Sequence, residues 1–149
     1  MCIRDRYYET IGGGSGAGKG FDGADGIQTH MTNSRLTDPE ILEQRYPVRL
    51  ELFALRHGRG GLGRWRGGDG LLRKFRFLAP LTASILSGSR RIAPFGLSGG
   101  LPGALGANQL EHFNGEREPL KGCATINIEA GEALLICTPG GGGYGTPRD

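Results

Sequence analysis

The sequence has little of what disulfide-stapled, zinc-binding or membrane-spanning proteins need. Its 149 residues hold three cysteines, Cys2, Cys123 and Cys137, which show no CxxC spacing and leave one thiol over if two pair. Neither a disulfide framework nor a structural zinc site is therefore expected, and a reducing cytoplasm is the expected location. No stretch approaches the roughly 20 apolar residues of a membrane span, so no membrane partner is expected.

The N-terminus also lacks an apolar segment. Residues 1–6 read MCIRDR, which has basic residues but no apolar core of a signal peptide, and they look unlike everything downstream. These six residues resemble a translated sequencing-adapter scar, so we treat them as non-native. The native part is expected to be residues 7–149, with its true start lying upstream.

Glycine is abundant instead, at 29 of the 149 residues against a usual share of roughly 7%. Ordinary helices tolerate so much glycine badly. The densest run directly follows the apolar run Ala133–Cys137, and bare backbone in such a place can approach a ligand closely. Successive amides there can form a concave site for an anion, although a surface turn is the alternative. The predicted substrate-binding residues are Gly140, Gly141, Gly142, Gly143 and Tyr144.

Hydropathy patterning predicts a mainly β fold with one short helix, an α+β class built of antiparallel strands and glycine loops. Asp38 can cap the helix, Pro39 suits its first turn, and Pro47 ends it. Strands are predicted at residues 48–54, 70–79, 81–86, 108–113, 124–129 and 133–137. In the first strand, one face is expected to hold Val48, Leu50, Leu52 and Ala54, opposite Arg49 and Glu51.

Positive charge is concentrated in one segment. From Arg56 to Arg91 there are nine basic residues against the single acid Asp69, although the net charge of the chain is only +3. Such a patch could track phosphates. Its arginines, however, alternate with large apolar residues, which is typical of a folded sheet. We therefore expect an arginine-rich subunit interface or a solvated sheet face, and no nucleic-acid partner.

One glycine motif imitates a nucleotide-binding loop. Gly13–Lys19 matches the first seven positions of the P-loop, but Gly20 stands where a serine or threonine must reach the magnesium ion. A P-loop also opens a helix, and residues 21–26 contain two more glycines. A flexible or ligand-approaching loop is the better interpretation, so this chain itself is not expected to bind ATP here.

The run Thr29–Arg35 gathers hydroxyl, imidazole, amide and guanidinium groups between glycine loops. Such groups can orient a carbonyl or carboxylate, and His30 can move a proton near neutral pH. A lone histidine is ordinarily a hydrogen-bonded structural residue, so both interpretations stay open. The predicted catalytic residues are His30, Thr32, Asn33 and Arg35. We expect this run and the glycine tail to lie side by side around a shared pocket.

The remaining ionisable side chains give weaker signals. No pair of histidines or acids has metal-ligand spacing such as HxxxH, so no metal site is expected. Asp22 and Asp25, close to His30 in sequence, are the only loose alternative. His57 and His112 are expected to have no cluster of partners.

A series of long motifs runs through the chain in a fixed order. The motifs lie at residues 7–18, 22–23, 29–33, 37–47, 58–70, 90–103 and 138–145. Together they resemble the hydantoinase B/5-oxoprolinase family over about residues 7–149. The resemblance is to the last part of the family's B subunit, so the chain is expected to be truncated at both ends.

This resemblance implies ATP-dependent opening of a cyclic amide, 5-oxoproline or a hydantoin, in the cytoplasm. A partner A subunit or domain of ATPase type would bind ATP and magnesium and phosphorylate the amide oxygen, and the B part would complete the hydrolysis. A hetero-oligomer is then expected, and the fragment alone is expected to be inactive. Two alternatives remain: a non-catalytic β-rich assembly module that docks a partner through its basic patch, and part of a related ATP-dependent carboxylase.

Overall fold

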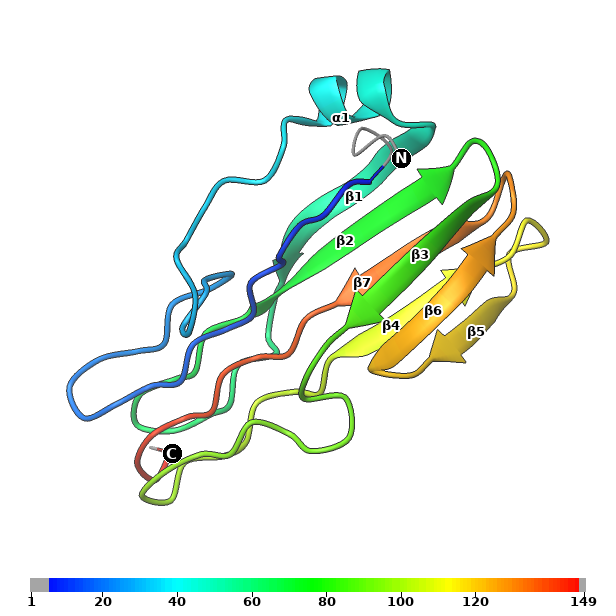
Figure 1. Cartoon of the computed structure of the whole chain (residues 1–149). Coiled ribbons are helices and arrows are strands. Elements are labelled where there is room, and N and C mark those ends of the chain that lie inside the picture. Colours follow the sequence, from blue (N-terminus) through cyan, green and yellow to red (C-terminus); the bar gives the residue numbers. More distant parts are fainter. Residues whose placement is uncertain (1–5, 148–149) are drawn as a thin grey trace.

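The computed structural model describes residues 6–147 and shows the predicted class, a mainly antiparallel β fold with one short helix (Figure 1). The expected scar at residues 1–6 lies outside the described residues except for Arg6, whose carbonyl accepts a hydrogen bond from the Tyr46 hydroxyl. In chain order the elements are α1 (Pro39–Arg45), β1 (Val48–Arg56), β2 (Gly70–Phe77), β3 (Leu81–Leu86), β4 (Ala107–Glu111), β5 (Arg117–Leu120), β6 (Cys123–Ile128) and β7 (Ala133–Cys137).

The strands form two antiparallel sheets. One has five strands in the order β1-β2-β7-β4-β5, and the other pairs β3 with β6. Phe75, Leu134 and Leu110 lie in one row across β2, β7 and β4, because each is the register partner of the next. The small sheet and α1 cover this row with Ile128 and Leu42, both fully buried. Burying a side chain of that size stabilises the fold by roughly 1.5–3 kcal/mol.

Helix α1 forms as the sequence predicts. The Asp38 carboxylate accepts a hydrogen bond of 3.0 Å from the amide of Glu40, and Pro39 occupies the first turn, where no amide donor is needed. The Glu43 carboxylate accepts a hydrogen bond of 2.9 Å from the amide of Leu50. That contact fixes the helix to the start of β1.

The predicted alternation in β1 is wrong in its second half, because a β-bulge shifts the register between Leu50 and Leu52. Leu50 pairs with Phe75 on the core face, but the next residue on that face is Phe53, which pairs with Arg73. Leu52 therefore moves to the opposite face, although Phe53 is itself 50% exposed on this edge strand. A single extra residue in the strand exchanges the faces of everything that follows it.

Extended glycine-rich segments, which we call the glycine bundle, form the other end of the molecule. It consists of residues 12–26, 58–70, 94–106 and 138–145, which gather near the C-terminus in Figure 1. Each segment donates main-chain hydrogen bonds to several neighbours instead of joining one flat sheet. A Cβ added at Gly141 would overlap the Ser15 carbonyl, and one at Gly142 would overlap the Phe95 carbonyl. Only glycine allows the backbones to approach this closely.

No helix within residues 6–147 has the length and apolar character that crossing a bilayer requires.

Candidate functional site

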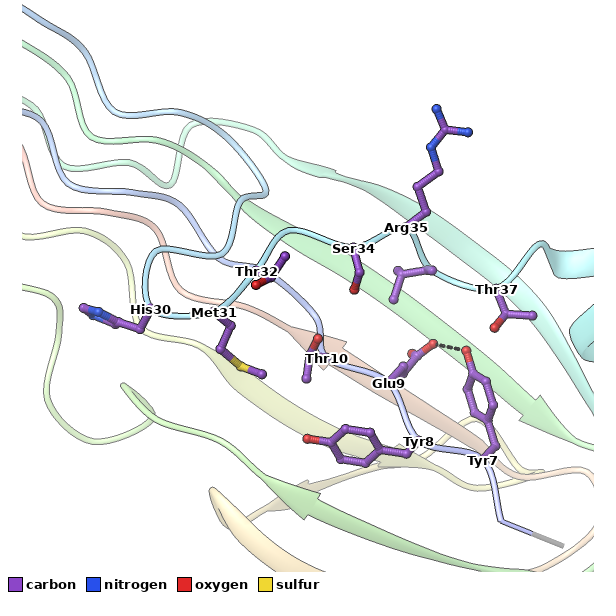
Figure 2. Close-up of a pocket in the computed structure, with 11 residues that line it drawn as sticks. Tyr7, Tyr8, Glu9, Thr10, His30, Met31, Thr32, Ser34, Arg35 and Thr37 are labelled. Carbon is purple, nitrogen blue, oxygen red and sulfur yellow. Dashed lines mark hydrogen bonds between the residues drawn. The ribbon is translucent and has the colours of Figure 1, made fainter. Parts of the chain in front are cut away.

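Most of the polar run Thr29–Arg35 lines one side of an open cavity of about 510 Å³ (Figure 2). The cavity lies between residues 7–10 and residues 30–37. Of the predicted catalytic residues, His30, Thr32 and Arg35 line it, whereas Asn33 does not. All four are exposed. The structure therefore brings three of the four to one water-accessible surface.

The side chains on this surface fall into three hydroxyl side chains and two outlying basic side chains. In Figure 2, Thr10, Thr32 and Ser34 lie between the two segments, while His30 and Arg35 extend away from them in different directions. The hydroxyls can both donate and accept hydrogen bonds, as binding an amide or a phosphate requires. The imidazole and guanidinium can reach a ligand only at the edges of the cavity.

Asn33 has a local structural contact. Its side-chain oxygen accepts a hydrogen bond of 2.7 Å from the amide of Gln28, and its side-chain nitrogen donates one of 3.0 Å to the carbonyl of Gln28. This reciprocal pair closes the loop that carries His30 and Thr32. Asn33 therefore positions its neighbours in this structure, and its predicted catalytic role stays a prediction.

A buried ion pair that the sequence reasoning missed holds the other wall of the cavity. The Glu9 carboxylate accepts two hydrogen bonds, of 2.7 and 2.9 Å, from Arg73, which is 1% exposed, and a third of 2.6 Å from the Tyr7 hydroxyl. Burial, reinforced by the bond to Glu9, raises the pKa of Tyr7. The Arg73 guanidinium lies 4.8 Å from the ring centre of Phe53 and 4.7 Å from that of Phe75.

The signal for this pair was present in the sequence. Arg73 alternates with Leu71 and Phe75 on the core face of β2, where a charge needs a partner because burying it alone is costly. The partner, Glu9, is 64 residues away in the sequence, so the pattern of β2 alone could not identify it.

The glycine tail differs from the expected open donor site. The amides of Gly140, Gly141 and Gly143 donate to the carbonyls of Ala104, Gly68 and Leu101, at 3.1, 2.8 and 2.9 Å. All four glycines of residues 140–143 are buried. The amides of Gly140, Gly141 and Gly143 are therefore not free to bind a ligand as expected. Contact of this segment with substrate stays a prediction.

The predicted shared pocket is not formed at the cavity beside His30, because none of residues 140–144 lines that cavity. Tyr144 lines a different one, with Trp65. Among the hydrogen bonds within residues 6–147, the tail joins the N-terminal glycine segment instead, where the amide of Gly14 donates to the carbonyl of Pro139 at 3.0 Å.

The basic segment is partly neutralised by acids of the same chain, and the expected arginine-rich interface or solvated sheet face stays a prediction. Lys74 and Arg76 pair with Glu51 and Glu111, at 3.1 and 2.6 Å from the Lys74 amine. These acids lie outside residues 56–91 in sequence, which is why a count within the segment overstated its charge. Hydrogen bonding to Arg76 lowers the pKa of Glu51 to about 2.

Asp69, the one acid within the basic segment, is a buried anchor for the glycine bundle. Its carboxylate accepts hydrogen bonds from the amides of Gly58, Arg59 and Gly60, at 3.0, 2.7 and 2.7 Å, and from the Arg66 side chain at 2.6 Å. Burial favours the protonated acid, but these four donors outweigh it and lower the pKa of Asp69 to about 2.

His112 has partners, contrary to expectation. Its Nδ1 lies 2.5 Å from a Glu132 carboxylate oxygen, and its Nε2 lies 3.4 Å from Glu118. The hydrogen bond to Glu132 raises the pKa of His112. Positive charge on the imidazole is therefore favoured at this end of the five-stranded sheet.

Within residues 6–147 no three histidine, cysteine, aspartate or glutamate side chains are arranged to hold a metal ion. The loose alternative at Asp22 and Asp25 has another explanation. The Asp22 carboxylate accepts a hydrogen bond of 2.7 Å from the amide of Arg66, and that of Asp25 accepts one of 2.6 Å from the amide of Asp69. Both carboxylates hold loops of the glycine bundle together.

Comparison with known proteins places this geometry in context. Residues 4–147 match the family described as Hydantoinase B/oxoprolinase. The chain is 55% identical over 140 residues to 5-oxoprolinase 1 of Arabidopsis thaliana and 49% identical over 139 residues to 5-oxoprolinase of Dictyostelium discoideum. These alignments cover 94% and 93% of this chain but only 11% of each relative.

A solved structure shares the fold. The ATP-dependent caprolactamase from Pseudomonas jessenii superposes with a TM-score of 0.68 at 26% identity, over 91% of this chain and 24% of that chain. The chain described here thus spans a small part of the length of the proteins it matches.

Proposed function

Since the chain belongs to the hydantoinase B/oxoprolinase family, we propose that it forms part of an ATP-dependent hydrolase that opens cyclic amides. Two relatives are named 5-oxoprolinase and the structural neighbour is named an ATP-dependent caprolactamase, which supports this class of reaction. The observation that carries the proposal is the cavity between residues 7–10 and 30–37, where hydroxyl side chains lie between the two segments and His30 and Arg35 stand at its edges.

The proposed chemistry starts from the low reactivity of an amide carbonyl. Transfer of the terminal phosphoryl group of ATP to the amide oxygen makes the carbonyl carbon electrophilic. A first water then adds to that carbon, the C–N bond breaks as the nitrogen takes up a proton, and a second water releases phosphate from the acyl phosphate. The site must therefore bind an anion, admit water and move protons.

The residues around the cavity suit these tasks. His30 would move the proton between water and the ring nitrogen, and Arg35 would bind the phosphoryl oxygens. The hydroxyls of Thr32, Ser34 and Thr10 would hold the ring amide by hydrogen bonds. Asn33 would keep the loop in shape through Gln28.

The proposal also includes a partner. An A-type ATPase subunit or domain would bind ATP and magnesium and carry out the phosphoryl transfer, which makes the working enzyme a hetero-oligomer or a multidomain chain in the cytoplasm. Support comes from the ATP dependence of the related caprolactamase and from the small share of each relative that this chain covers. The exposure of the cavity leaves room for the rest of the enzyme to cover it.

Substitution of His30 in the complete enzyme tests this function. His30→Ala should lower kcat for ring opening by about 100-fold or more, as loss of a general acid–base group does. ATP consumption should fall less, because the partner still phosphorylates the substrate. His57→Ala is the matched control, since His57 is exposed and lies outside the cavity. An unchanged kcat for His30→Ala would exclude the assigned role.

One observation favours a second function, that of a non-catalytic assembly module. Several large apolar side chains on the loop before β4 are exposed, including Ile92 at 82% and Phe95 at 76%, and a partner could cover them. If Phe95→Ser abolishes assembly of the complex while His30→Ala leaves its turnover intact, the module interpretation is correct. Lost turnover with normal assembly in His30→Ala supports the catalytic one.

A further inference from the structure

A second cavity, of about 460 Å³, lies on the surface of the glycine bundle and has a different chemical character from the one at His30. Its lining residues are Lys19, Arg64, Trp65, Tyr144, Gly145 and Thr146. Two are cations, two are large aromatic residues and none is an acid. Of these residues, only Tyr144 is among the predicted substrate-binding residues.

The aromatic floor of this cavity is held by the main chain. The amide of Trp65 donates to the carbonyl of Tyr144 at 3.0 Å, and the amide of Tyr144 donates back to the carbonyl of Trp65 at 2.9 Å. The amide of Gly145 donates to the carbonyl of Leu97 at 2.9 Å, so Tyr144 is fixed from both sides. The ring centres of Trp65 and Tyr144 lie 5.8 Å apart, and the two ring planes are tilted by 57°. A tilted pair of this kind does not stack face to face.

Arg64 and Lys19 supply the charge. The Arg64 guanidinium lies 4.9 Å from the ring centre of Trp65, in the range of a cation–π contact. Neither Arg64 nor Lys19 is among the ion pairs formed within residues 6–147. This contrasts with the basic residues of β2, whose charge is balanced by Glu9, Glu51 and Glu111.

Lys19 reaches this place through the segment that imitates a P-loop. Gly18 and Phe21 exchange main-chain hydrogen bonds of 3.1 and 3.3 Å, so Lys19 and Gly20 form the tip of a tight turn. Gly20 has a φ of 95°, which a type II turn requires of its third residue. The turn does not open a helix, and it places Lys19 among the residues that line the cavity.

We propose that this cavity binds a small planar molecule that carries an oxyanion, either a phosphate or a carboxylate. The flat part would lie against one of the two tilted rings and meet the other at its edge, and the oxyanion would meet Lys19 and Arg64. A positive cavity with no acid in its lining attracts such a ligand electrostatically, and a frame of main-chain hydrogen bonds costs little reorganisation on binding. This site is separate from the cavity of the proposed function and does not depend on it.

The test uses the fact that Trp65 is the only tryptophan in the sequence, so tryptophan emission of the 149-residue chain reports on this cavity alone. The ligands to titrate are AMP, benzoate, inorganic phosphate and adenosine. Saturable quenching by AMP, by benzoate or by both is expected, and which of them binds distinguishes a phosphate from a carboxylate site. Adenosine should give no saturation, because it lacks the charge.

Two variants and a control complete the experiment. Lys19→Gln and Arg64→Gln should each weaken the binding of the saturating anion by about tenfold, the loss of one charge-assisted contact. Arg49→Gln removes an exposed cation on β1, outside the cavity, and should leave the affinity unchanged. Circular dichroism verifies that each variant is folded. Equal quenching by adenosine and AMP, or unaltered affinity in both cavity variants, would overturn the proposal.

Discussion

Arg76 and Glu111 meet across Ala133. The three residues form one row over β2, β7 and β4, and the Arg76 guanidinium reaches over the central residue to Glu111 at 3.1 Å. Ala133 is fully buried beneath this bridge. A small side chain at the centre therefore allows two long ones from non-adjacent strands to form an ion pair, which continues to Lys74 and Glu51.

Enlarging Ala133 should separate the pair. Ala133→Leu adds three carbons under the bridge, and overpacking of this kind costs about 1–3 kcal/mol in the free energy of unfolding. Urea denaturation measures the loss. Ala130→Leu, in the exposed turn just before the strand, should change stability by less than about 0.5 kcal/mol. Equal stability of the two variants would show that the bridge over Ala133 does not constrain the sheet.

Asp69 should make the fold sensitive to acid. Its pKa is lowered to about 2 in the folded protein, against roughly 3.9 in an unfolded chain, so its contribution is complete above pH 4 to 5 and is lost as the pH falls toward 2. Asp69→Asn should cost roughly 3 kcal/mol or more at neutral pH, because Arg66 and the amides lose a charged acceptor.

Unfolding in urea at neutral pH and at about pH 3 tests this prediction. The difference in stability between wild type and Asp69→Asn should shrink at the lower pH. Glu129→Gln is the control, since Glu129 is exposed, and should change neither value. A constant difference at both pH values would contradict the assigned role of the ionised carboxylate.

His112 should stabilise the fold at low pH, in contrast to Asp69, which stabilises it at higher pH. Glu132 raises the pKa of His112 in the folded protein, so the interaction stabilises fully below the unfolded pKa of roughly 6.5 and is lost as the pH rises through the folded pKa. His112→Asn should therefore lower the melting temperature at about pH 6 and have less effect at about pH 9. NMR titration of the His112 ring in the wild type and in Glu132→Gln measures the effect directly, and an unchanged pKa of His112 in the variant would refute the pair.

Local pattern was enough to predict the elements whose signals lie within one segment. The cap at Asp38 and the apolar run of β7 identified α1 and the central strand from a few neighbouring residues each. Strand β5 was missed because Pro119 and its two exposed charged neighbours, Arg117 and Glu118, leave it no alternating apolar face. The bulge at Leu52 could not be predicted either, since it depends on how β1 pairs with β2.

The candidate site was only partly predictable for the same reason. His30, Thr32 and Arg35 are neighbours in sequence and so reach one surface together. The wall that faces them depends on Glu9 and Arg73, which only the tertiary fold brings together. The sequence could show that the tail approaches something closely, but not that the other glycine-rich segments would accept its hydrogen bonds.

Gly141 offers the sharpest test of the glycine bundle. Gly141 packs against the Ser15 carbonyl so closely that the Cβ of Gly141→Ala must displace a neighbouring backbone. The expected cost is roughly 2 kcal/mol or more in the free energy of unfolding. Gly88→Ala is the matched control, because nothing lies near an added Cβ there and its backbone needs no positive φ. That variant should be neutral or more stable by about 0.4–1 kcal/mol, since alanine restricts the unfolded chain. If Gly141→Ala unfolds at the same urea concentration as Gly88→Ala, the segments are not packed backbone to backbone.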